Sequence, residues 1–321
     1  MKITHVICQI LRIQNVEAKT AGTQDSLLIR VRTDTGLEGV GEADASPEIL
    51  KAVIDAPFSH NIACGLRELL IGENPLETER IWQKLYRRTM YFGRRAVGIA
   101  AMAGVDMALW DLKGKYFGEP IHRLLGGKLH SSIPAYASIL FGRDGLETRE
   151  IAQRWKKSGC FKDFQIGWLE EPLHQDDLDG YVWLRDRSPV PIAAGEGECG
   201  RAAFKPWIDR HALDVYQVDL ARNGFTDGNY IRQRVEEAGG RLCNHCYKTP
   251  ISVAGCLHWL SSCRDAFLFE DCVEDSPLRH ELTLERMQAV DGRIAVPDRP
   301  GLGITLNEKF VAEHLIAESG R

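Results

Sequence analysis

The sequence predicts an α/β protein in which a parallel β/α barrel follows an α+β unit. Three features of the 321-residue chain point to this arrangement. The first third reads as strands followed by helices. From residue 131 onward, short apolar runs alternate with polar, helix-like stretches, a pattern typical of parallel strands buried on both faces. An ionisable residue ends each of several successive apolar runs, at nearly constant spacing.

The first 45 residues are predicted to form β structure. Apolar residues alternate in ITHVICQILRI and again in SLLIRVRTDTGLEGVGEAD, as they do in half-buried strands. Thr35-Gly36, inside the second segment, offers a hairpin turn.

Residues 47–125 are predicted to be helical. One helix is expected to begin at Asn74-Pro75 in NPLETERIWQKLYRRT, because Asn is a good cap and Pro suits the first turn. The run RRAVGIAAMAGVDMALWDLKGKYFG is rich in small residues and is expected to form one long helix that ends near Gly118 and Pro120.

The apolar runs of the second region end in ionisable residues. In chain order these are Glu170, Glu196, Asp219, His245 and then the group Glu270, Asp271 and Glu274. The first four are separated by 26, 23 and 26 residues, and the last group lies 25 to 29 residues further on. A strand, a helix and two short loops need about this length. Because the carboxyl ends of barrel strands converge on one face, the spacing predicts that these side chains share a pocket.

Each of these residues, taken alone, has a simpler explanation. A Glu or Asp at the end of a strand is more often a cap or loop residue. A lone His in CNHC is more often packed or hydrogen-bonded. Four consecutive repeats with such a residue at similar spacing favour a functional site over these alternatives.

The residue types indicate a particular chemistry. Several carboxylates in one pocket repel each other and resist ionisation, and a hard divalent cation relieves this. Two or three carboxylate oxygens with open positions for substrate and water are typical of Mg²⁺. An Asp and a His on adjacent strands supply an oriented base. Together they suit removal of a weakly acidic proton next to a carboxylate, with the metal stabilising the enediolate.

Six segments together resemble the enolase superfamily, in its mandelate racemase branch: AGVDMALWDLKGKYFGEPIHRLLGG, WLEEP, AAGE, YQVDLARNGF, NHCYKTP and VPDRPGLGI. Their order and spacing match the family nearly from end to end, apart from one interval. The resemblance implies a (β/α)₇β TIM-type barrel with an α+β capping domain. It also implies bound Mg²⁺ and, because members often form dimers or octamers, a homo-oligomer. Many members of this branch are acid-sugar dehydratases, and others are racemases or epimerases.

Domain limits follow from the change of sequence pattern at residue 131 and from the strand-like pattern of the C-terminal segment. The capping domain is expected to span residues 1–130 and to be completed by the C-terminal segment 293–321. The barrel domain is expected to span residues 131–292.

The resemblance also assigns residues to roles. Glu170 and Glu196 match metal ligands. Asp219 and His245 match a catalytic dyad, in which His245 is the base or the acid that expels a β-hydroxyl group. Glu274 lies nearest to the acid that binds the substrate carboxylate, with Glu270 and Asp271 as alternatives.

Two loops of the capping domain, around Lys19–Asp25 and Ser46–Phe58, are expected to close over the substrate. Lys19 and Thr20 of the first loop are expected to bind it. Tyr91 and Arg94 are assigned the same role from their position in the sequence, the alternative for Arg94 being a solvated helix start.

One interval of the chain is shorter than the family requires. Three β/α steps are expected between the first barrel strand, which ends near Ser138, and Glu170, yet these residues are only 32 positions apart. At the usual length of a step, about 50 residues are missing, corresponding to strands 2 and 3. The lost part would carry the first metal ligand, an aspartate, and the lysine used by racemases. Lys162 is a possible remnant, but neither it nor Asp163 is assigned to chemistry.

The short interval has three explanations. A segment of the natural protein is absent from this sequence, or the deletion is real and leaves a gapped, inactive barrel, or another chain fills the gap. The smooth match on both sides favours the first. If the sequence is complete, weak Mg²⁺ affinity and little turnover are expected, since a barrel without two strands has two open edges.

Composition excludes several classes of protein. A formal net charge of −5 gives no indication of a nucleic-acid or anionic-membrane partner. No apolar run has the length of a membrane span, and the N-terminus does not resemble a signal peptide. The nine cysteines form no paired metal motif, so reduced, buried thiols and a cytoplasmic location are expected.

The leading functional hypothesis is a Mg²⁺-dependent acid-sugar dehydratase. It would abstract the proton α to a carboxylate, pass through an enediolate, and eliminate the β-hydroxyl group to give a 2-keto-3-deoxy acid. A racemase or epimerase on the same scaffold is the first alternative. The second is a catalytically impaired protein that keeps the fold as a scaffold.

Overall fold

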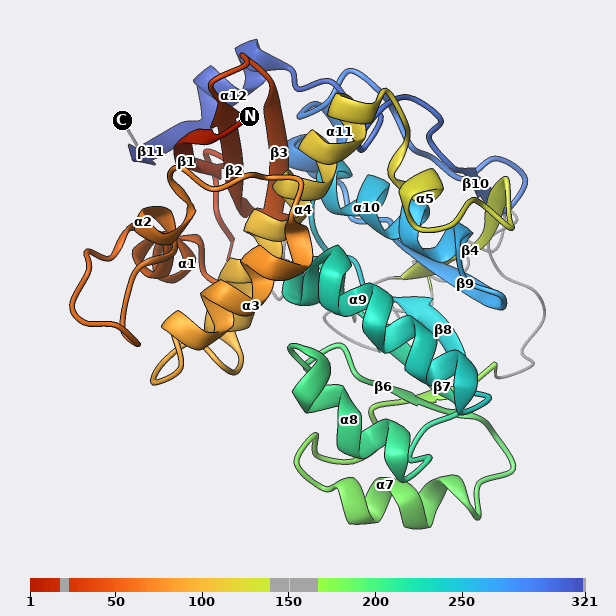
Figure 1. Cartoon of the computed structure of the whole chain (residues 1–321). Helices are drawn as coiled ribbons and strands as arrows, with labels where there is room; N and C mark the ends of the chain where they lie inside the picture. The colour runs from red at the N-terminus through yellow and green to blue at the C-terminus, as the bar shows by residue number, and fades with distance from the viewer. Residues whose placement is uncertain (18–22, 139–149, 151–166, 320–321) are drawn as a thin grey trace.

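The structure is a computed structural model that describes residues 1–17, 23–138, 150 and 167–319 (Figure 1). The N-terminal elements are β1 (Ile3–Arg12), β2 (Asp25–Thr33), β3 (Glu38–Ala43), α1 (Pro47–Asp55), α2 (Leu66–Leu70), α3 (Thr78–Arg88), α4 (Val97–Phe117) and α5 (Ile121–Leu124). The elements that follow are β4 (Ser132–Ser138), β5 (Leu169–Glu170), α7 (Leu178–Arg185), β6 (Ile192–Ala194), α8 (Arg201–Asp209), β7 (Val215–Val218), α9 (Leu220–Glu237), β8 (Arg241–Asn244), α10 (Pro250–Ser261), β9 (Ala266–Cys272), α11 (Pro277–His280), β10 (Arg293–Ala295), α12 (Glu308–His314) and β11 (Leu315–Ser319).

The first sheet is antiparallel and has the strand order β11-β1-β2-β3. The predicted β structure of the N-terminus is confirmed. Gly36 lies in the turn between β2 and β3 with a φ of 82°, a conformation that glycine adopts without steric cost. The last strand, β11, pairs with β1, so the two ends of the described chain lie side by side (Figure 1).

The predicted helical region contains one correction. The helix expected at Asn74-Pro75 begins instead at Thr78. Asn74 caps a local turn, because its Oδ1 accepts a hydrogen bond from the backbone N–H of Leu76 at 3.2 Å. The long helix is confirmed as α4, which ends at Gly118 in the left-handed conformation.

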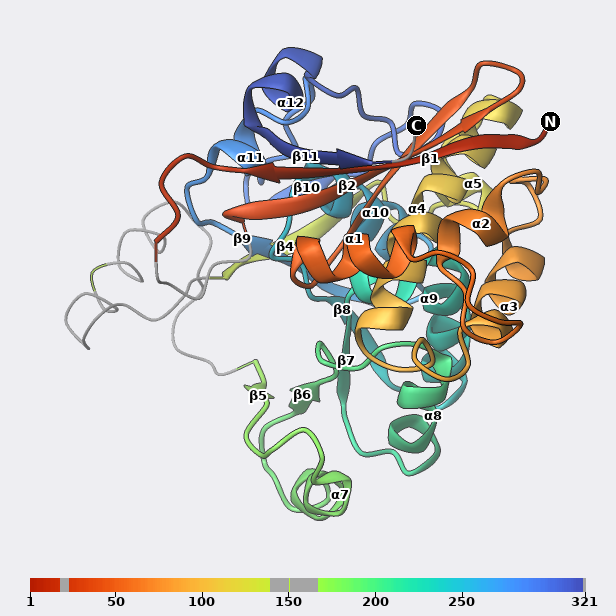
Figure 2. The same ribbon diagram turned by 90° about the vertical axis from the view of Figure 1, so that its left-hand side faces the viewer.

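Helix α4 lies between the first sheet and α9, as Figures 1 and 2 show. Glycines in β3 permit a close approach of strand and helix. A Cβ atom at Gly41 would lie 2.1 Å from the carbonyl oxygen of Gly104 in α4. The other face of α4 contacts α9, where Trp110 packs against Phe225 with ring centroids 5.8 Å apart.

The second sheet has the order β10-β4-β9-β8-β7-β6-β5. Its strands are parallel except β10, which runs antiparallel to β4. Within the described residues no strand joins β4 to β5, so this part of the chain forms a curved half-barrel with an edge at β5. The predicted barrel with a capping unit is therefore confirmed, and the two strands expected to be missing are absent from the described residues.

Two further expectations from the sequence are tested by the structure. All eight cysteines in the described part of the chain are free and buried, as predicted. No helix among the described residues is long and apolar enough to cross a membrane.

Candidate active site

The half-barrel presents its ionisable residues at the carboxyl ends of its strands. Glu170 is the last residue of β5, Asp219 directly follows β7, and His245 directly follows β8. Glu196 lies two residues beyond β6, and Glu270 lies within β9. Strands β5 to β9 are parallel neighbours, so their carboxyl ends lie along the same edge of the sheet, as the sequence predicts.

Asp219 and His245 form a buried hydrogen-bonded pair. The Nδ1 atom of His245 lies 2.7 Å from Oδ2 of Asp219, and the side chains are 2% and 7% exposed. The other carboxylate oxygen of Asp219 accepts from the N–H of Ala221 at 2.7 Å and thereby caps α9. This double role fixes the carboxylate. Because Asp219 occupies Nδ1 of His245, the other ring nitrogen, Nε2, is directed toward Glu196 and lies 3.8 Å from Oε2 of Glu196.

The electrostatics favour a protonated imidazole in the metal-free protein. Burial alone lowers the pKa of His245, but the hydrogen bond to Asp219 and the charges of Glu270 and Glu196 outweigh it and raise the pKa to about 10. Burial raises the pKa of Glu196, and repulsion from Glu171 and Glu270 adds to this effect. The carboxylates at the strand ends therefore favour the proton on His245 and disfavour ionisation of one another.

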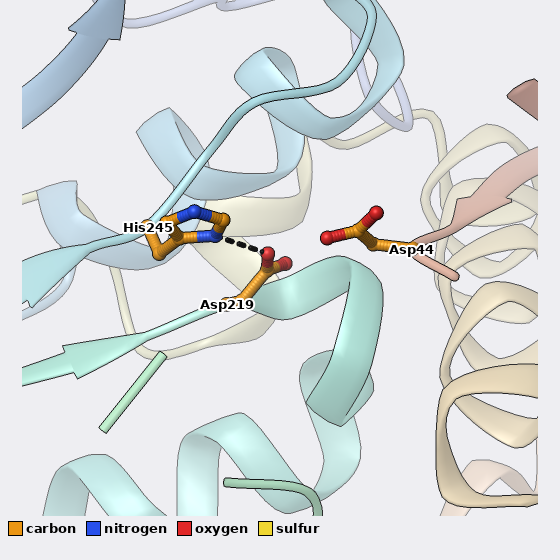
Figure 3. Close-up of side chains that lie close together, drawn as sticks. All are labelled: Asp44, Asp219 and His245. Carbon is orange, nitrogen blue, oxygen red and sulfur yellow. Dashed lines mark hydrogen bonds and ion pairs between the residues drawn. The ribbon is translucent and has the colours of Figure 1, made fainter. Parts of the chain in front are cut away.

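A third carboxylate reaches the dyad from the first sheet. Asp44 directly follows β3, and ligand atoms of Asp44, Asp219 and His245 all lie within 4.8 Å of one another (Figure 3). This spacing suits one metal ion. The charges do not, because Asp44 is already paired with Nη2 of Arg222 at 2.7 Å and Nζ of Lys248 at 3.2 Å. A cation placed there would face two positive groups, the buried ammonium of Lys248 and the partly buried guanidinium of Arg222.

Glu170 and Glu196 are the residues that the sequence predicts as ligands of a hard cation. They are carboxylates at the ends of neighbouring strands, and neither forms an ion pair with a lysine or arginine of the described chain. Glu170 is exposed, and its Oε2 accepts a hydrogen bond from the indole N–H of Trp168 at 2.9 Å. The predicted third ligand, an aspartate on a strand between β4 and β5, has no counterpart among the described residues.

The three carboxylates at the end of β9 have different surroundings and partners in the structure. Glu270 is 3% exposed and accepts a hydrogen bond from the backbone N–H of Cys246, next to the dyad, at 2.9 Å. Asp271 pairs instead with Arg279 at 3.4 Å. Glu274 lies beyond β9 and is half-buried. Of the three, Glu270 has the contacts that bring it to His245.

The predicted substrate-binding residues are not brought together by the described structure. Lys19 and Thr20 lie outside the described residues. Tyr91 is 73% exposed and meets the ring of His60 edge-on. Arg94 lines a cleft of about 210 Å³ together with Trp82 and Arg201. The expectation of a loop at Ser46–Phe58 is wrong, since most of this range is helix α1.

Sequence reasoning missed three residues of this site: Asp44, Arg222 and Lys248. Arg222 and Lys248 each follow a predicted dyad residue by three positions, so their nearness to the pocket was open to prediction. Asp44 gave no such signal. The position of Asp44 near the dyad depends on how the first sheet packs against the half-barrel. Local sequence patterns do not predict such packing between distant segments.

The chain is similar to known proteins over most of its length. The model for the mandelate racemase / muconate lactonizing enzyme N-terminal domain matches residues 2–126, and the model described as enolase C-terminal domain-like matches residues 145–310. A D-galactarolactone cycloisomerase of Agrobacterium fabrum is 27% identical over 350 aligned positions, covering 89% of this chain and 90% of that protein. A D-galactonate dehydratase of Pectobacterium atrosepticum is 26% identical with the same coverage.

A solved structure shares the fold over nearly the whole chain. The 3,6-anhydro-D-galactonate cycloisomerase from Zobellia galactanivorans superposes with a TM-score of 0.85 at 25% identity, covering 99% of this chain and 100% of that one. The length of the alignments is informative too. The 350 positions aligned with the Agrobacterium protein exceed the 321 residues of this chain. The relative therefore contains residues that have no counterpart here.

Proposed function

Because the chain belongs to the enolase superfamily, in its mandelate racemase branch, we propose that it is a Mg²⁺-dependent acid-sugar dehydratase. The observation that carries the proposal is the buried Asp219–His245 pair at the strand ends, with Nε2 of His245 directed toward Glu196. A proton-transfer group beside carboxylates that could hold a divalent cation suits abstraction of a proton α to a carboxylate.

The proposed reaction removes water from a 2,3-dihydroxy acid. Neutral His245 would take the α-proton at Nε2, the C–O bond to the β-hydroxyl group would break, and the departing hydroxide would take that proton from His245 and leave as water. The resulting enol becomes a 2-keto-3-deoxy acid. His245 exchanges protons with the substrate through Nε2, because Asp219 occupies Nδ1. Asp219 keeps the ring oriented and stabilises its protonated form.

Glu170 and Glu196 are the residues that would hold Mg²⁺. When bound, the ion would neutralise the substrate carboxylate and stabilise the negative charge that develops as the α-proton leaves. Glu270 is buried against the loop of His245 and lies where it can orient the substrate. We infer this role for Glu270 rather than Glu274 from its contacts.

The relatives support six-carbon sugar acids as the first substrates to test. Their names identify a D-galactonate dehydratase and cycloisomerases of galactarolactone and anhydrogalactonate. The test is incubation of the protein with a panel of aldonates and aldarates in D₂O, with Mg²⁺ or with EDTA. We expect a 2-keto acid only with Mg²⁺. Exchange of the α-proton without a keto acid would indicate a racemase or epimerase instead.

A catalytically impaired scaffold is the second candidate. Among the described residues, no strand pairs with the outer edge of β5 and no third carboxylate ligand is present, and both observations favour this candidate. A scaffold would keep the fold and would form a homo-oligomer without turnover. Failure of the wild-type chain to bind Mg²⁺ in calorimetry, together with an assembled state in light scattering, would favour it over the dehydratase.

A further inference from the structure

Asp44 joins the first sheet to the catalytic dyad. Its side chain is only 10% exposed, although it comes from a different unit of the fold than Asp219 and His245 (Figure 3). Its backbone N–H donates to the carbonyl oxygen of Ala221 at 3.0 Å. The residue is therefore tied to the half-barrel by both its backbone and its carboxylate.

The first partner of the carboxylate is Arg222, three residues after Asp219. Nε and Nη2 of Arg222 lie 2.9 and 2.7 Å from Oδ2 of Asp44. Nη1 of the same guanidinium donates to the backbone carbonyl of Glu196 at 2.6 Å. Arg222 thus connects Asp44 to the backbone of the strand-end segment that carries a proposed metal ligand.

The second partner is Lys248, three residues after His245. Its Nζ lies 3.2 Å from Oδ1 of Asp44, and the residue is 3% exposed. Its carbonyl oxygen accepts from Nη1 of Arg279 at 2.8 Å. The Asp44 carboxylate therefore binds the first turn of α9 with one oxygen and the loop after β8 with the other.

Removal of this charge would have a specific consequence. Arg222 and Lys248 are both largely withdrawn from water, so without Asp44 they would be left as two neighbouring positive groups. The next carboxylate within reach of Arg222 is Asp219, whose Oδ2 already lies 3.7 Å from its Nε. That oxygen is the one that accepts from His245. A released Arg222 would therefore compete with His245 for Asp219.

We propose that Asp44 is a positioning residue, which keeps Arg222 and Lys248 away from Asp219 and so preserves the Asp219–His245 hydrogen bond. Its effect on turnover rests on the proposed function, but its effect on the hydrogen bond does not. The position of the first sheet on the half-barrel would therefore influence the geometry of the Asp219–His245 hydrogen bond.

The test compares Asp44→Asn with a matched control, Asp55→Asn. Asp55 is also a partly buried carboxylate of the N-terminal unit that pairs with one lysine and one arginine, Lys51 and Arg67, but it is remote from the dyad. The primary readout is the Nδ1 proton resonance of His245 in full-length, metal-free protein, assigned with His245→Gln. A short hydrogen bond to a carboxylate gives such a proton a distinct downfield position.

We expect Asp44→Asn to shift or abolish this resonance and Asp55→Asn to leave it unchanged. The double variant Asp44→Asn with Arg222→Gln is expected to recover it, because no guanidinium is left to compete for Asp219. If Asp44→Asn does not fold, Asp44→Glu, which keeps the charge, is expected to fold and retain the resonance. An unchanged resonance in folded Asp44→Asn, or no recovery in the double variant, would overturn the proposal.

Two further outcomes are decisive. Calorimetric Mg²⁺ binding that Asp44→Asn abolishes and Glu196→Gln leaves intact would make Asp44 a metal ligand, contradicting the positioning role. If the wild type turns over a sugar acid, Asp44→Asn is expected to lower kcat by at least about tenfold with little change in KM. Absence of turnover in the wild type would count against the dehydratase alone, since the resonance test needs no substrate.

Discussion

Asp219 accepts a hydrogen bond from Nδ1 of His245 at 2.7 Å while its second oxygen caps helix α9. The pair joins the ends of two neighbouring parallel strands, β7 and β8. Because both side chains are buried, the orientation of the imidazole depends on this one carboxylate. The first two predictions follow from that dependence.

Replacement of Asp219 by Asn is expected to remove most of the activity. Asn has nearly the same shape but no negative charge, and it permits the wrong tautomer of His245. Where a buried Asp orients a catalytic His in this way, loss of the charge lowers kcat by about 10²–10⁴-fold. Steady-state rates of keto-acid formation measure the effect. Asp214→Asn, at a carboxylate paired with Arg185 and outside the dyad, is the control, and equal losses in both variants would contradict the assigned role.

The same pair makes stability depend on pH in the metal-free protein. The pKa of His245 is raised from 6.5 to about 10 by folding. The folded state therefore binds a proton that the unfolded chain releases between these values. This contribution to stability is fully present below pH 6.5 and is lost as pH rises through about 10, at about 1 kcal/mol per pH unit.

Urea unfolding in EDTA at several pH values between 6.5 and 10 measures this slope. The free energy of unfolding of the wild type is expected to fall more steeply with pH than that of Asp219→Asn, in which His245 has lost its charged partner. Parallel curves for the two proteins would show that the pair does not stabilise the imidazolium.

Mg²⁺ affinity is expected to depend on Glu196 and Glu170. Calorimetry should show a loss of at least about tenfold in affinity for Glu196→Gln and for Glu170→Gln, because each removes one anionic ligand of a hard cation. Glu171→Gln is the matched control, since the Glu171 carboxylate accepts instead from the side chain of Gln175. Equal affinity in all four proteins would place the ion elsewhere.

Much of this site could be predicted from the sequence because its residues recur at nearly constant spacing, each at the end of an apolar run. Glu196, Asp219 and His245 each end an apolar run, and parallel strands bring such ends together whatever the helices between them contain. Local signals also predicted two other features. A glycine at its C-terminal end indicated the long helix α4, and a turn between two alternating runs indicated the hairpin at Gly36.

Other features depend on contacts between distant segments and had no local signal. Asp44 reaches the dyad because the end of β3 packs on α4 and also contacts α9 and α10 of the half-barrel. The start of α3 was misplaced because Asn74 caps a turn with Leu76 rather than a helix. The choice of Glu270 over Glu274 required knowing that β9 continues through Cys272, so that Glu270 faces the dyad from within the strand.

The contact between β3 and α4 predicts a large cost for a small substitution. In Gly41→Ala the new methyl group would lie 2.1 Å from the carbonyl oxygen of Gly104, so the strand and the helix must separate. We expect a loss of about 2–3 kcal/mol in the free energy of unfolding, as measured by urea denaturation. Gly167→Ala, where no atom lies within 4 Å of the added Cβ, is expected to change stability little. Similar stabilities for both variants would contradict the packing described here.

The most direct test of the account is formation of 2-keto-3-deoxy acid from sugar acids by the wild type and by His245→Asn, both with Mg²⁺. The account predicts product from at least one aldonate or aldarate with the wild type, and a rate lower by at least about 10³-fold for His245→Asn with its fold intact. Equal rates for the two proteins, or no keto acid from any sugar acid with folded wild type that binds Mg²⁺, would contradict it.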